Sequence, residues 1–94
     1  MDAEVTHNQA QSRYEIRLDG TLVGFADYER VEDGTYVFPH TEVDPSFQGR
    51  GLAARLVAAA LDDVRRAGGS VVPACWYVAQ FIQRNPGYSD LVAA

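Results

Sequence analysis

The chain has 94 residues, of which 47% are hydrophobic and 22% are charged, a composition typical of one soluble globular domain with a single core. Its net charge is −5, and its eight arginines are spread among thirteen acidic residues, so it lacks the clustered basic surface that nucleic-acid binding requires. No apolar run approaches the roughly 20 residues of a membrane helix, so we expect neither a membrane nor a nucleic-acid partner.

Residues 1–11 are polar and show no hydrophobic period, which predicts a flexible N-terminus before a single domain over residues 12–94. No charged and apolar leader opens the chain, so we expect no export signal. The single cysteine, Cys75, can form no intrachain disulfide and has no cysteine partner for a zinc site. These features favour a cytoplasmic protein without a metal site.

Three extended segments follow the N-terminal residues. Polar and apolar residues alternate over 13–18, which predicts a half-buried strand, and Asp19-Gly20 predicts a hairpin turn. Residues 21–28 are apolar on both faces, as in a strand covered on two sides, with a possible bulge at Gly24. A third strand is predicted over 35–43, and Pro39 within it indicates a bulge or a free edge, because proline cannot donate a ladder hydrogen bond.

The second half of the chain changes to a helical period. Apolar residues recur with a period of 3.6 over residues 51–67, which predicts an amphipathic helix ended by Gly68-Gly69. A short buried strand is expected over residues 70–75 and a helix over 76–84 that stops before Pro86. This order predicts an α+β (mixed α/β) fold, with antiparallel strands, then a strand-loop-helix-strand crossover and a short C-terminal helix.

The junction between the third strand and the long helix, Gln48-Gly49-Arg50-Gly51-Leu52-Ala53, has the features of an anion site. The first N–H groups of a helix have no partner within it, and the helix dipole adds partial positive charge there. Glycines at 49 and 51 remove the Cβ atoms that would hold an anion away. Arg50 and Arg55 could add charge-assisted hydrogen bonds, although two glycines before a helix are also common turn residues.

The run from Val43 to Ala53 resembles motif A of the GNAT acetyltransferase superfamily, whose Q/R-x-x-G-x-G/A signature binds the pyrophosphate of coenzyme A. Gln48, Gly51 and Ala53 fill the three signature positions. Together with His40-Thr41-Glu42-Val43, Cys75-Trp76-Tyr77 and Arg84-Asn85-Pro86, the chain is similar to short GNAT proteins of the N-acetyltransferase domain-containing protein 1 type and their bacterial relatives.

This resemblance covers the chain from about residue 14 to about residue 91. It implies a reduced GNAT-like fold that uses acetyl-coenzyme A. The chain has no room for the N-terminal helix pair and final strands that usually shape the acceptor site, so the acceptor is left open. The resemblance implies that the cofactor is bound by residues Val43, Gln48, Gly49, Arg50, Gly51, Leu52 and Ala53.

Acetyl transfer needs donors for the developing oxyanion, a base for the amine and an acid for the departing thiolate. The resemblance gives the first role to the backbone of Val43, with Glu42. His40 and Glu42 are candidate bases, because residues two apart on a strand share a face, which we expect to be the face toward the thioester. A solvated or core-satisfied pair is the alternative.

Cys75 is a candidate acid or nucleophile, but free cysteines are commonly buried and inert, which favours a small core residue. Many GNAT enzymes use a tyrosine as the acid after this strand, which makes Tyr77 and Tyr88 candidates. Trp76, Phe81 and Ile82 are expected in the core, and Arg84 on the surface or near a cofactor phosphate.

The sequence therefore predicts an acetyl-CoA-dependent N-acetyltransferase that works by direct attack in a ternary complex. The acceptor is a small-molecule or protein amine, and the protein is a monomer or weak homodimer. The alternatives are a coenzyme A-binding module that acts as a sensor or scaffold, and an anion-binding structural domain.

Overall fold

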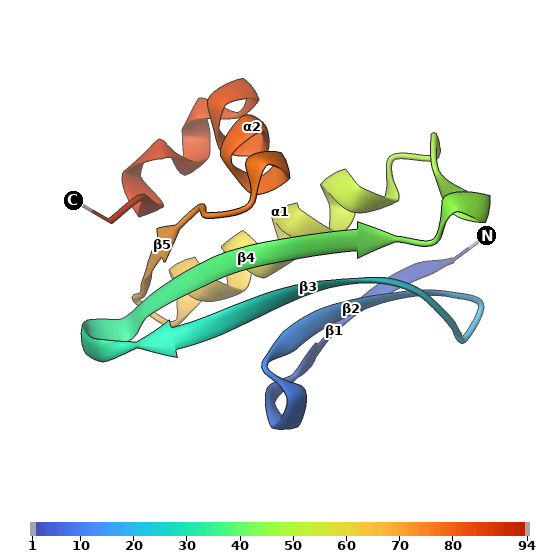
Figure 1. Ribbon diagram of the computed structural model, residues 1–94, viewed down its shortest axis with the longest axis horizontal. Helices are drawn as coiled ribbons and strands as arrows, with labels where there is room; N and C mark the ends of the chain where they lie inside the picture. The colour runs from blue at the N-terminus through green and yellow to red at the C-terminus, as the bar shows by residue number, and fades with distance from the viewer. Residues whose placement is uncertain (1, 94) are drawn as a thin grey trace.

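The computed structural model describes residues 2–93 and contains one five-stranded sheet (Figure 1). The strands lie side by side in chain order, and the first four are antiparallel, whereas the fifth is parallel to the fourth. Their bounds are β1 Ala3–Asn8, β2 Arg13–Leu18, β3 Thr21–Val31, β4 Thr35–Val43 and β5 Ser70–Val72. Parallel pairing of β4 and β5 requires a crossover between them, and a helix provides it.

Helices α1, Leu52–Arg66, and α2, Trp76–Arg84, lie on the same side of β4. α1 contacts all five strands, and α2 contacts β4 and α1. Four short 3₁₀ turns connect the elements, at Gln9–Gln11, Glu32–Gly34, Pro45–Phe47 and Pro86–Leu91. The predicted α+β fold with a strand-loop-helix-strand crossover is confirmed. No helix among residues 2–93 is long and apolar enough to cross a membrane.

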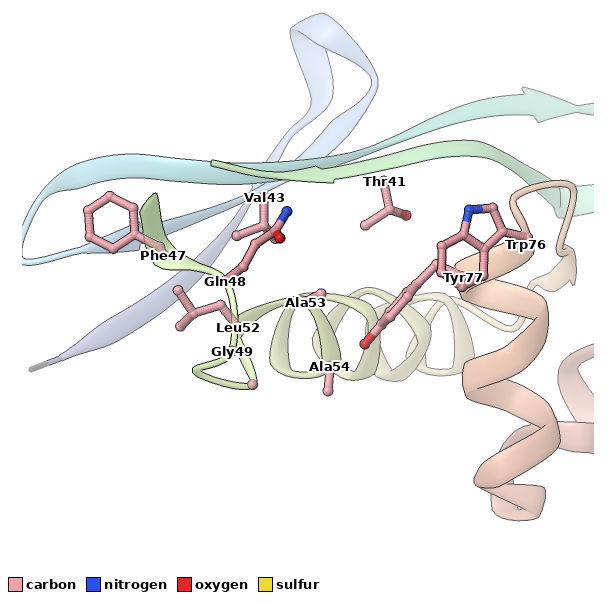
Figure 2. A pocket seen from close by; sticks show the side chains of 11 residues that line it. Thr41, Val43, Phe47, Gln48, Gly49, Leu52, Ala53, Ala54, Trp76 and Tyr77 are labelled. Atoms are coloured by element: carbon pink, nitrogen blue, oxygen red, sulfur yellow. The ribbon is translucent and has the colours of Figure 1, made fainter. Parts of the chain in front are cut away.

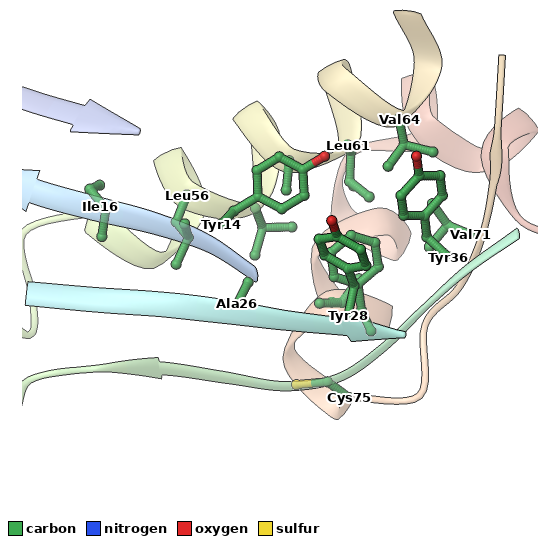
Figure 3. Packing of buried hydrophobic residues seen from close by; sticks show 14 of the residues in the cluster. Tyr14, Ile16, Ala26, Tyr28, Tyr36, Leu56, Leu61, Val64, Val71 and Cys75 are labelled. Carbon is green, nitrogen blue, oxygen red and sulfur yellow. The ribbon is translucent and has the colours of Figure 1, made fainter. Parts of the chain in front are cut away.

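The core lies between the sheet and α1. Alternate residues of β2, namely Tyr14, Ile16 and Leu18, are buried on one face of the strand. Figure 3 shows Tyr14 and Ile16 on the side of the sheet that α1 covers. The buried residues of that stripe are Leu52, Leu56, Val57, Ala60, Leu61 and Val64. This packing explains why the sequence changes its hydrophobic period from two to 3.6 between the strands and the helix.

The prediction of a flexible N-terminus over residues 1–11 is wrong for residues 3–11. Residues 3–8 form β1, which pairs with β2 along its whole length, and residues 9–11 form a 3₁₀ turn. Val5 packs against the core, and the ring of His7 stacks on Tyr14 with 4.2 Å between centroids. The segment is ordered because β2 offers it an edge to pair with. Met1 lies outside the described residues.

Two bulges bend the central strands. β3 has an extra residue at Val23, next to the predicted position Gly24. A Cβ atom on Gly24 would lie 2.8 Å from the carbonyl oxygen of Glu42, so only glycine lets β3 and β4 approach this closely. In the pairing of β4 with β3, two residues, Phe38 and Pro39, lie opposite the single residue Tyr28. The predicted bulge at Pro39 is therefore confirmed.

The predicted element bounds differ most at two strands, and α1 is one residue shorter at each end than the predicted 51–67. β3 runs to Val31, three residues beyond the prediction, because it pairs with β4 as far as Thr35. β5 ends at Val72 instead of continuing to residue 75, since Pro73 follows and the chain then turns into α2.

Candidate active site

β4 and β5 pair only where Thr35–Val37 meets Ser70–Val72, and beyond that point the structure shows no further pairing between them. The Asp44 N–H donates to the carbonyl oxygen of Val23 on β3 at 2.8 Å. Because antiparallel pairs alternate, the Glu42 N–H faces β3, and the N–H groups of Thr41 and Val43 face the open side. The predicted exposure of the Val43 N–H is consistent with this pattern, and the neighbouring N–H that faces the same side belongs to Thr41 and not to Glu42.

A cavity of about 460 Å³ opens between the end of β4, the loop before α1 and the start of α2 (Figure 2). Its lining residues are Thr41, Val43, Phe47, Gln48, Gly49, Gly51, Leu52, Ala53, Ala54, Trp76 and Tyr77. The cavity has two chemically different ends. One end is formed by the glycine loop and the first turn of α1, and the other by Thr41, Trp76 and Tyr77.

The loop end has the features that favour anion binding. Gly51 precedes α1 with a φ of 73°, and no side chain caps the helix there. The first helical hydrogen bond runs from the Arg55 N–H to the Gly51 carbonyl oxygen, so the N–H groups of Leu52, Ala53 and Ala54 have no acceptor within the helix. All three residues line the cavity. The positive end of the helix dipole therefore faces a space bordered by free donors.

Gly49 and Gly51 both have the left-handed backbone that favours glycine, with φ values of 82° and 73°. Apart from the glycine itself and its two chain neighbours, no heavy atom lies within 4 Å of the position that a Cβ would take on either residue. The two glycines thus leave open space beside the helix end, and any side chain there would project into it.

Six of the seven residues predicted to bind the cofactor line the cavity: Val43, Gln48, Gly49, Gly51, Leu52 and Ala53. Arg50 does not line it, and its guanidinium lies 5.4 Å from the centroid of the Phe47 ring. Arg55 points away, because its guanidinium donates to the carbonyl oxygen of Ala3 at 3.4 Å. Positive charge at the loop end therefore comes from the helix dipole more than from arginine.

The other end of the cavity contains two aromatic residues at the start of α2. Trp76 is 73% exposed, so the prediction that it lies in the core is wrong, whereas Phe81 packs against the core and Ile82 is buried within it. The buried face of α2 is formed by Val78 and Ile82, and Trp76 lies off that face. Its indole is edge-on to Tyr77, with 5.8 Å between ring centroids.

Tyr77 is the one candidate acid that lines the cavity. Burial raises the pKa of its hydroxyl, and the nearby positive charge of Arg84 opposes that rise. The hydroxyl is therefore protonated at neutral pH and can act as a proton donor. Arg84 itself borders a smaller hollow that shares Ala54 and Tyr77 with the main cavity.

His40 and Glu42 share a face of β4, as predicted, but that face is the one away from the cavity. Their side chains are more than half exposed, and His40 Nε2 lies 3.1 Å from Glu42 Oε1. Neither residue lines the cavity. The bulge at Pro39 explains this, because it shifts the alternation of β4 by one residue and turns Thr41 and Val43 toward the cavity.

The remaining candidates lie outside the cavity. Cys75 is 7% exposed within the core cluster, and its N–H donates to the carbonyl oxygen of Phe38 at 2.7 Å, which agrees with a small core residue. The Tyr88 hydroxyl donates to Asp62 on α1 at 2.9 Å. Thr41 and Trp76 line the cavity but are not among the predicted site residues, although Pro39 in β4 was a signal that the strand changes phase there.

Comparisons with known proteins agree with this geometry. The family described as GCN5-related N-acetyl-transferase matches residues 13–91. Protein NATD1 of Xenopus tropicalis is 34% identical over 83 residues, which cover 87% of this chain and 76% of that protein.

Two solved structures are similar in fold. One is the solution structure of a GCN5-like protein from Staphylococcus aureus, with a TM-score of 0.74 and 16% identity, covering 97% of this chain and 88% of that one. The other is N-acetylglutamate synthase from Neisseria gonorrhoeae in complex with coenzyme A and N-acetyl-glutamate, with a TM-score of 0.57 and 26% identity over 64% of this chain and 15% of that one. The chain therefore belongs to the GCN5-related N-acetyltransferase family.

Proposed function

We propose that this protein is an acetyl-CoA-dependent N-acetyltransferase that transfers the acetyl group directly to an amine in a ternary complex. The observation that carries the proposal is the two-ended cavity between the uncapped end of α1 and the unpaired edge of β4. Its residues fit acetyl-coenzyme A, because one end offers donors to a pyrophosphate and the other offers donors to a thioester carbonyl. When bound, this molecule supplies an activated acetyl group.

At the loop end, the N–H groups of Leu52, Ala53 and Ala54 would donate to phosphate oxygens, and the open space at Gly49 and Gly51 lets the backbone come close. Arg84 is a further candidate phosphate contact, because it borders the adjoining hollow. These groups bind and orient, and they take no part in proton transfer.

At the aromatic end, the N–H groups of Thr41 and Val43 face the space where the acetyl carbonyl would lie, and would stabilise the negative charge that develops on its oxygen. The Tyr77 hydroxyl would give its proton to the departing thiolate. Cys75 is not assigned a role, because it lies in the core and outside the cavity.

The acceptor amine would approach the edge of β4 from the face that α1 does not cover. His40 and Glu42 lie on that face, so the imidazole could take the amine proton while the Glu42 carboxylate orients it. The chain has a net charge of −5, which favours a cationic acceptor such as a polyamine or a lysine side chain. We also propose a monomer or weak homodimer in the cytoplasm, because the single cysteine and the composition of the chain favour it.

A direct test combines binding with turnover. Acetyl-coenzyme A at about 100 times its dissociation constant should stabilise the fold by about 2.7 kcal/mol. For a domain of this size, that corresponds to a rise in melting temperature on the order of ten degrees. Release of free coenzyme A thiol should then depend on an added amine, across a panel of polyamines, peptides with free N-termini and peptides with internal lysines. No stabilisation at millimolar ligand would contradict the proposal.

A coenzyme A-binding module without catalysis is the second candidate. It is favoured by the position of His40 and Glu42, neither of which lines the cavity. The same experiment separates the two functions. Stabilisation by acetyl-coenzyme A without amine-dependent thiol release, over the whole panel, would support the binding module and exclude the transferase.

A further inference from the structure

Another hollow, the β3–β4 hollow, lies between the first residues of β3 and the end of β4. Its volume is about 240 Å³. Its lining combines three apolar side chains, Leu22, Phe25 and Pro45, with the carboxylates of Glu42 and Asp44. It shares no lining residue with the cavity that is proposed to bind acetyl-coenzyme A. The hollow is therefore separate from the cofactor site.

The pairing of the strands places the hollow on the face of the sheet that α1 does not cover. Residues directly opposite in an antiparallel pair share a face. Phe25 is opposite Glu42, which faces away from the cofactor cavity, and Leu22 is opposite Arg17 of β2, on the face away from the core. The hollow therefore opens on the same face as His40, the residue proposed to take the amine proton.

The apolar part of the hollow is accessible to a ligand. The side chain of Leu22 is 40% exposed, and Phe25 is half-buried. Methylene groups that lie against these side chains would be removed from water together with them, which favours binding. The hollow therefore suits an aliphatic chain.

The two carboxylates of the hollow have no arginine partner. Glu42 pairs only with His40, at 3.1 Å, and that imidazole is neutral when it acts as a base. Asp44 Oδ1 accepts a hydrogen bond from the Ser46 N–H at 2.9 Å, and among residues 2–93 Asp44 forms no ion pair. Two negative charges beside an apolar wall are complementary to a cation on an aliphatic chain.

The arginines on the same face do not neutralise these charges. Arg13 and Arg17 of β2 both bind Glu15, at 2.7 Å and 3.1 Å, and neither forms an ion pair with a carboxylate of the hollow. The guanidinium groups are therefore held over β2, and the carboxylates at the end of β4 are available to a ligand.

We infer that the β3–β4 hollow binds the methylene chain and second ammonium group of an aliphatic diamine or polyamine, whose other amino group is acetylated at the open edge of β4. This inference rests on the proposed function and names the class of its acceptor. Neighbouring strands lie about 4.8 Å apart, so a chain of a few methylene groups is long enough to cross β4 from the hollow to its open edge.

The second ammonium group takes no part in the chemistry. The other nitrogen attacks the acetyl carbonyl carbon, so that the C–N bond forms and the C–S bond breaks, with the electron pair leaving on sulfur. His40 takes the proton of the attacking amine, and Tyr77 protonates the sulfur. The ammonium group in the hollow keeps its protons and its charge, and the product is a diamine acetylated at one end.

Steady-state kinetics with two probes test the inference. Hexamethylenediamine and hexylamine have the same aliphatic chain, and only the diamine has a second ammonium group. Wild type should have a kcat/KM about fivefold higher for the diamine, counted per amino group to correct for its two equivalent ends, because one partly exposed ion pair contributes about that factor. The gain should appear in KM and not in kcat, since the second ammonium is bound equally before and during the reaction.

Two variants of the hollow and one control locate the effect. Asp44→Asn removes a charge but keeps a side-chain oxygen for the Ser46 N–H, and it should lower the preference to about twofold because Glu42 remains. Leu22→Arg adds a cation to the wall and should abolish the preference. Both variants should acetylate hexylamine like wild type. Asp33→Asn removes the same charge from the turn at the other end of β3 and β4 and should keep the fivefold preference.

A binding measurement in the absence of cofactor is independent of turnover. NMR of the ¹⁵N-labelled protein should show shifts of the Leu22, Phe25 and Asp44 amide signals on titration with hexamethylenediamine. The shifts should be smaller with hexylamine at the same concentration, and smaller in Leu22→Arg with either probe.

The outcomes distinguish this inference from the proposed function. Equal kcat/KM per amino group for the two probes in wild type, an unchanged preference in Asp44→Asn, or an equal loss in Asp33→Asn would overturn the inference and leave the transferase intact. Failure to acetylate any amine would contradict the transferase, whereas amide shifts at the hollow that depend on the second ammonium would still support the diamine site. Absence of both would contradict both.

Discussion

The two halves of the sheet differ in whether their polar groups have hydrogen-bond partners within the protein. Around β1, β2 and α1, buried polar groups are paired: the Tyr14 hydroxyl donates to Asp63 at 2.7 Å, and Glu15 binds Arg13 at 2.7 Å and Arg17 at 3.1 Å. At the β4 edge, the N–H groups of Thr41 and Val43 face the open side of the strand, and the first N–H groups of α1 have no acceptor within the helix. The comparison separates groups that hold the fold together from groups that are available to a ligand.

The largest expected effect is at the glycine loop, beside the uncapped end of α1. Gly51→Glu places a carboxylate beside the uncapped end of α1, where the cofactor phosphates are proposed to bind. The variant should therefore lose the stabilisation by acetyl-coenzyme A, which in wild type is a rise in melting temperature on the order of ten degrees. Gly20→Glu is the matched control, because Gly20 also has a positive φ and an open Cβ position but lies in the β2–β3 hairpin. Loss of the shift in both variants would show that strain, and not the anion site, is responsible.

The next effect concerns proton transfer. Tyr77→Phe should lower kcat of the proposed reaction by about 100-fold, the lower end of the range for a lost general acid, and leave the affinity for coenzyme A nearly unchanged. Steady-state kinetics with the best amine of the panel would measure it. Tyr88→Phe is the control, since its hydroxyl binds Asp62 outside the cavity. An unchanged kcat in Tyr77→Phe would remove this residue from the mechanism.

Around β1, β2 and α1, Glu15→Ala should destabilise the fold by about 2 kcal/mol at pH 7, because hydrogen bonds to a charged group are lost. Ligand binding should be unaffected. Burial alone would raise the pKa of Glu15, but hydrogen bonds from Arg13, Asn8 and Arg17 together lower it below its ordinary value of 4.5. A lowered pKa means that the stabilisation is present above pH 4.5 and is lost as the pH falls through the folded-state value.

Chemical denaturation of wild type and Glu15→Ala between pH 7 and pH 2 would follow this loss. The difference in free energy of unfolding between the two proteins should be constant at neutral pH and shrink in acid. A difference that stays constant down to pH 2 would contradict the paired carboxylate as its source.

The smallest expected effect is at the hydrogen bond between β2 and α1. Tyr14→Phe should cost about 1 kcal/mol, the value of one hydrogen bond, since the ring stays in the core. That bond is the main cause that lowers the pKa of Asp63, so the variant should also be less sensitive to acid than wild type. Burial, and after it the hydrogen bond to Asp63, raises the pKa of Tyr14 itself. The stabilisation of the fold by this hydrogen bond should therefore be lost only above about pH 10. Thermal melts at pH 3, 7 and 10.5 would measure the three effects.

Local signals in the sequence were sufficient for most of the fold. β2, β4 and α2 have the predicted bounds, because alternation, helical period and the flanking turn residues are all properties of neighbouring residues. β1 was missed because its one strongly apolar residue, Val5, gives too weak a pattern. Its order comes from pairing with β2, a contact that no local pattern can show.

The site was predictable at the loop and less so at the strand. Gln48, Gly49 and Gly51 line the cavity, and the two glycines indicated this loop because only glycine readily adopts its left-handed backbone. The orientation of His40 and Glu42 depends on the extra residue of β4 at Phe38 and Pro39. Pro39 indicated a bulge or a free edge, and only a bulge shifts the alternation of the residues that follow. Trp76 is exposed because Val78 and Ile82, and not Trp76, form the face of α2 that packs against the core.

The central claim is that the free donors of the β4 edge and of the α1 end bind one ligand together. Backbone amide chemical shifts of the ¹⁵N-labelled protein, followed by NMR during titration with acetyl-coenzyme A, test this most directly. The account predicts the largest changes at Leu52, Ala53 and Ala54 and, in the same titration, at Thr41 and Val43. Changes confined to one end of the cavity, or none at millimolar ligand, would contradict it.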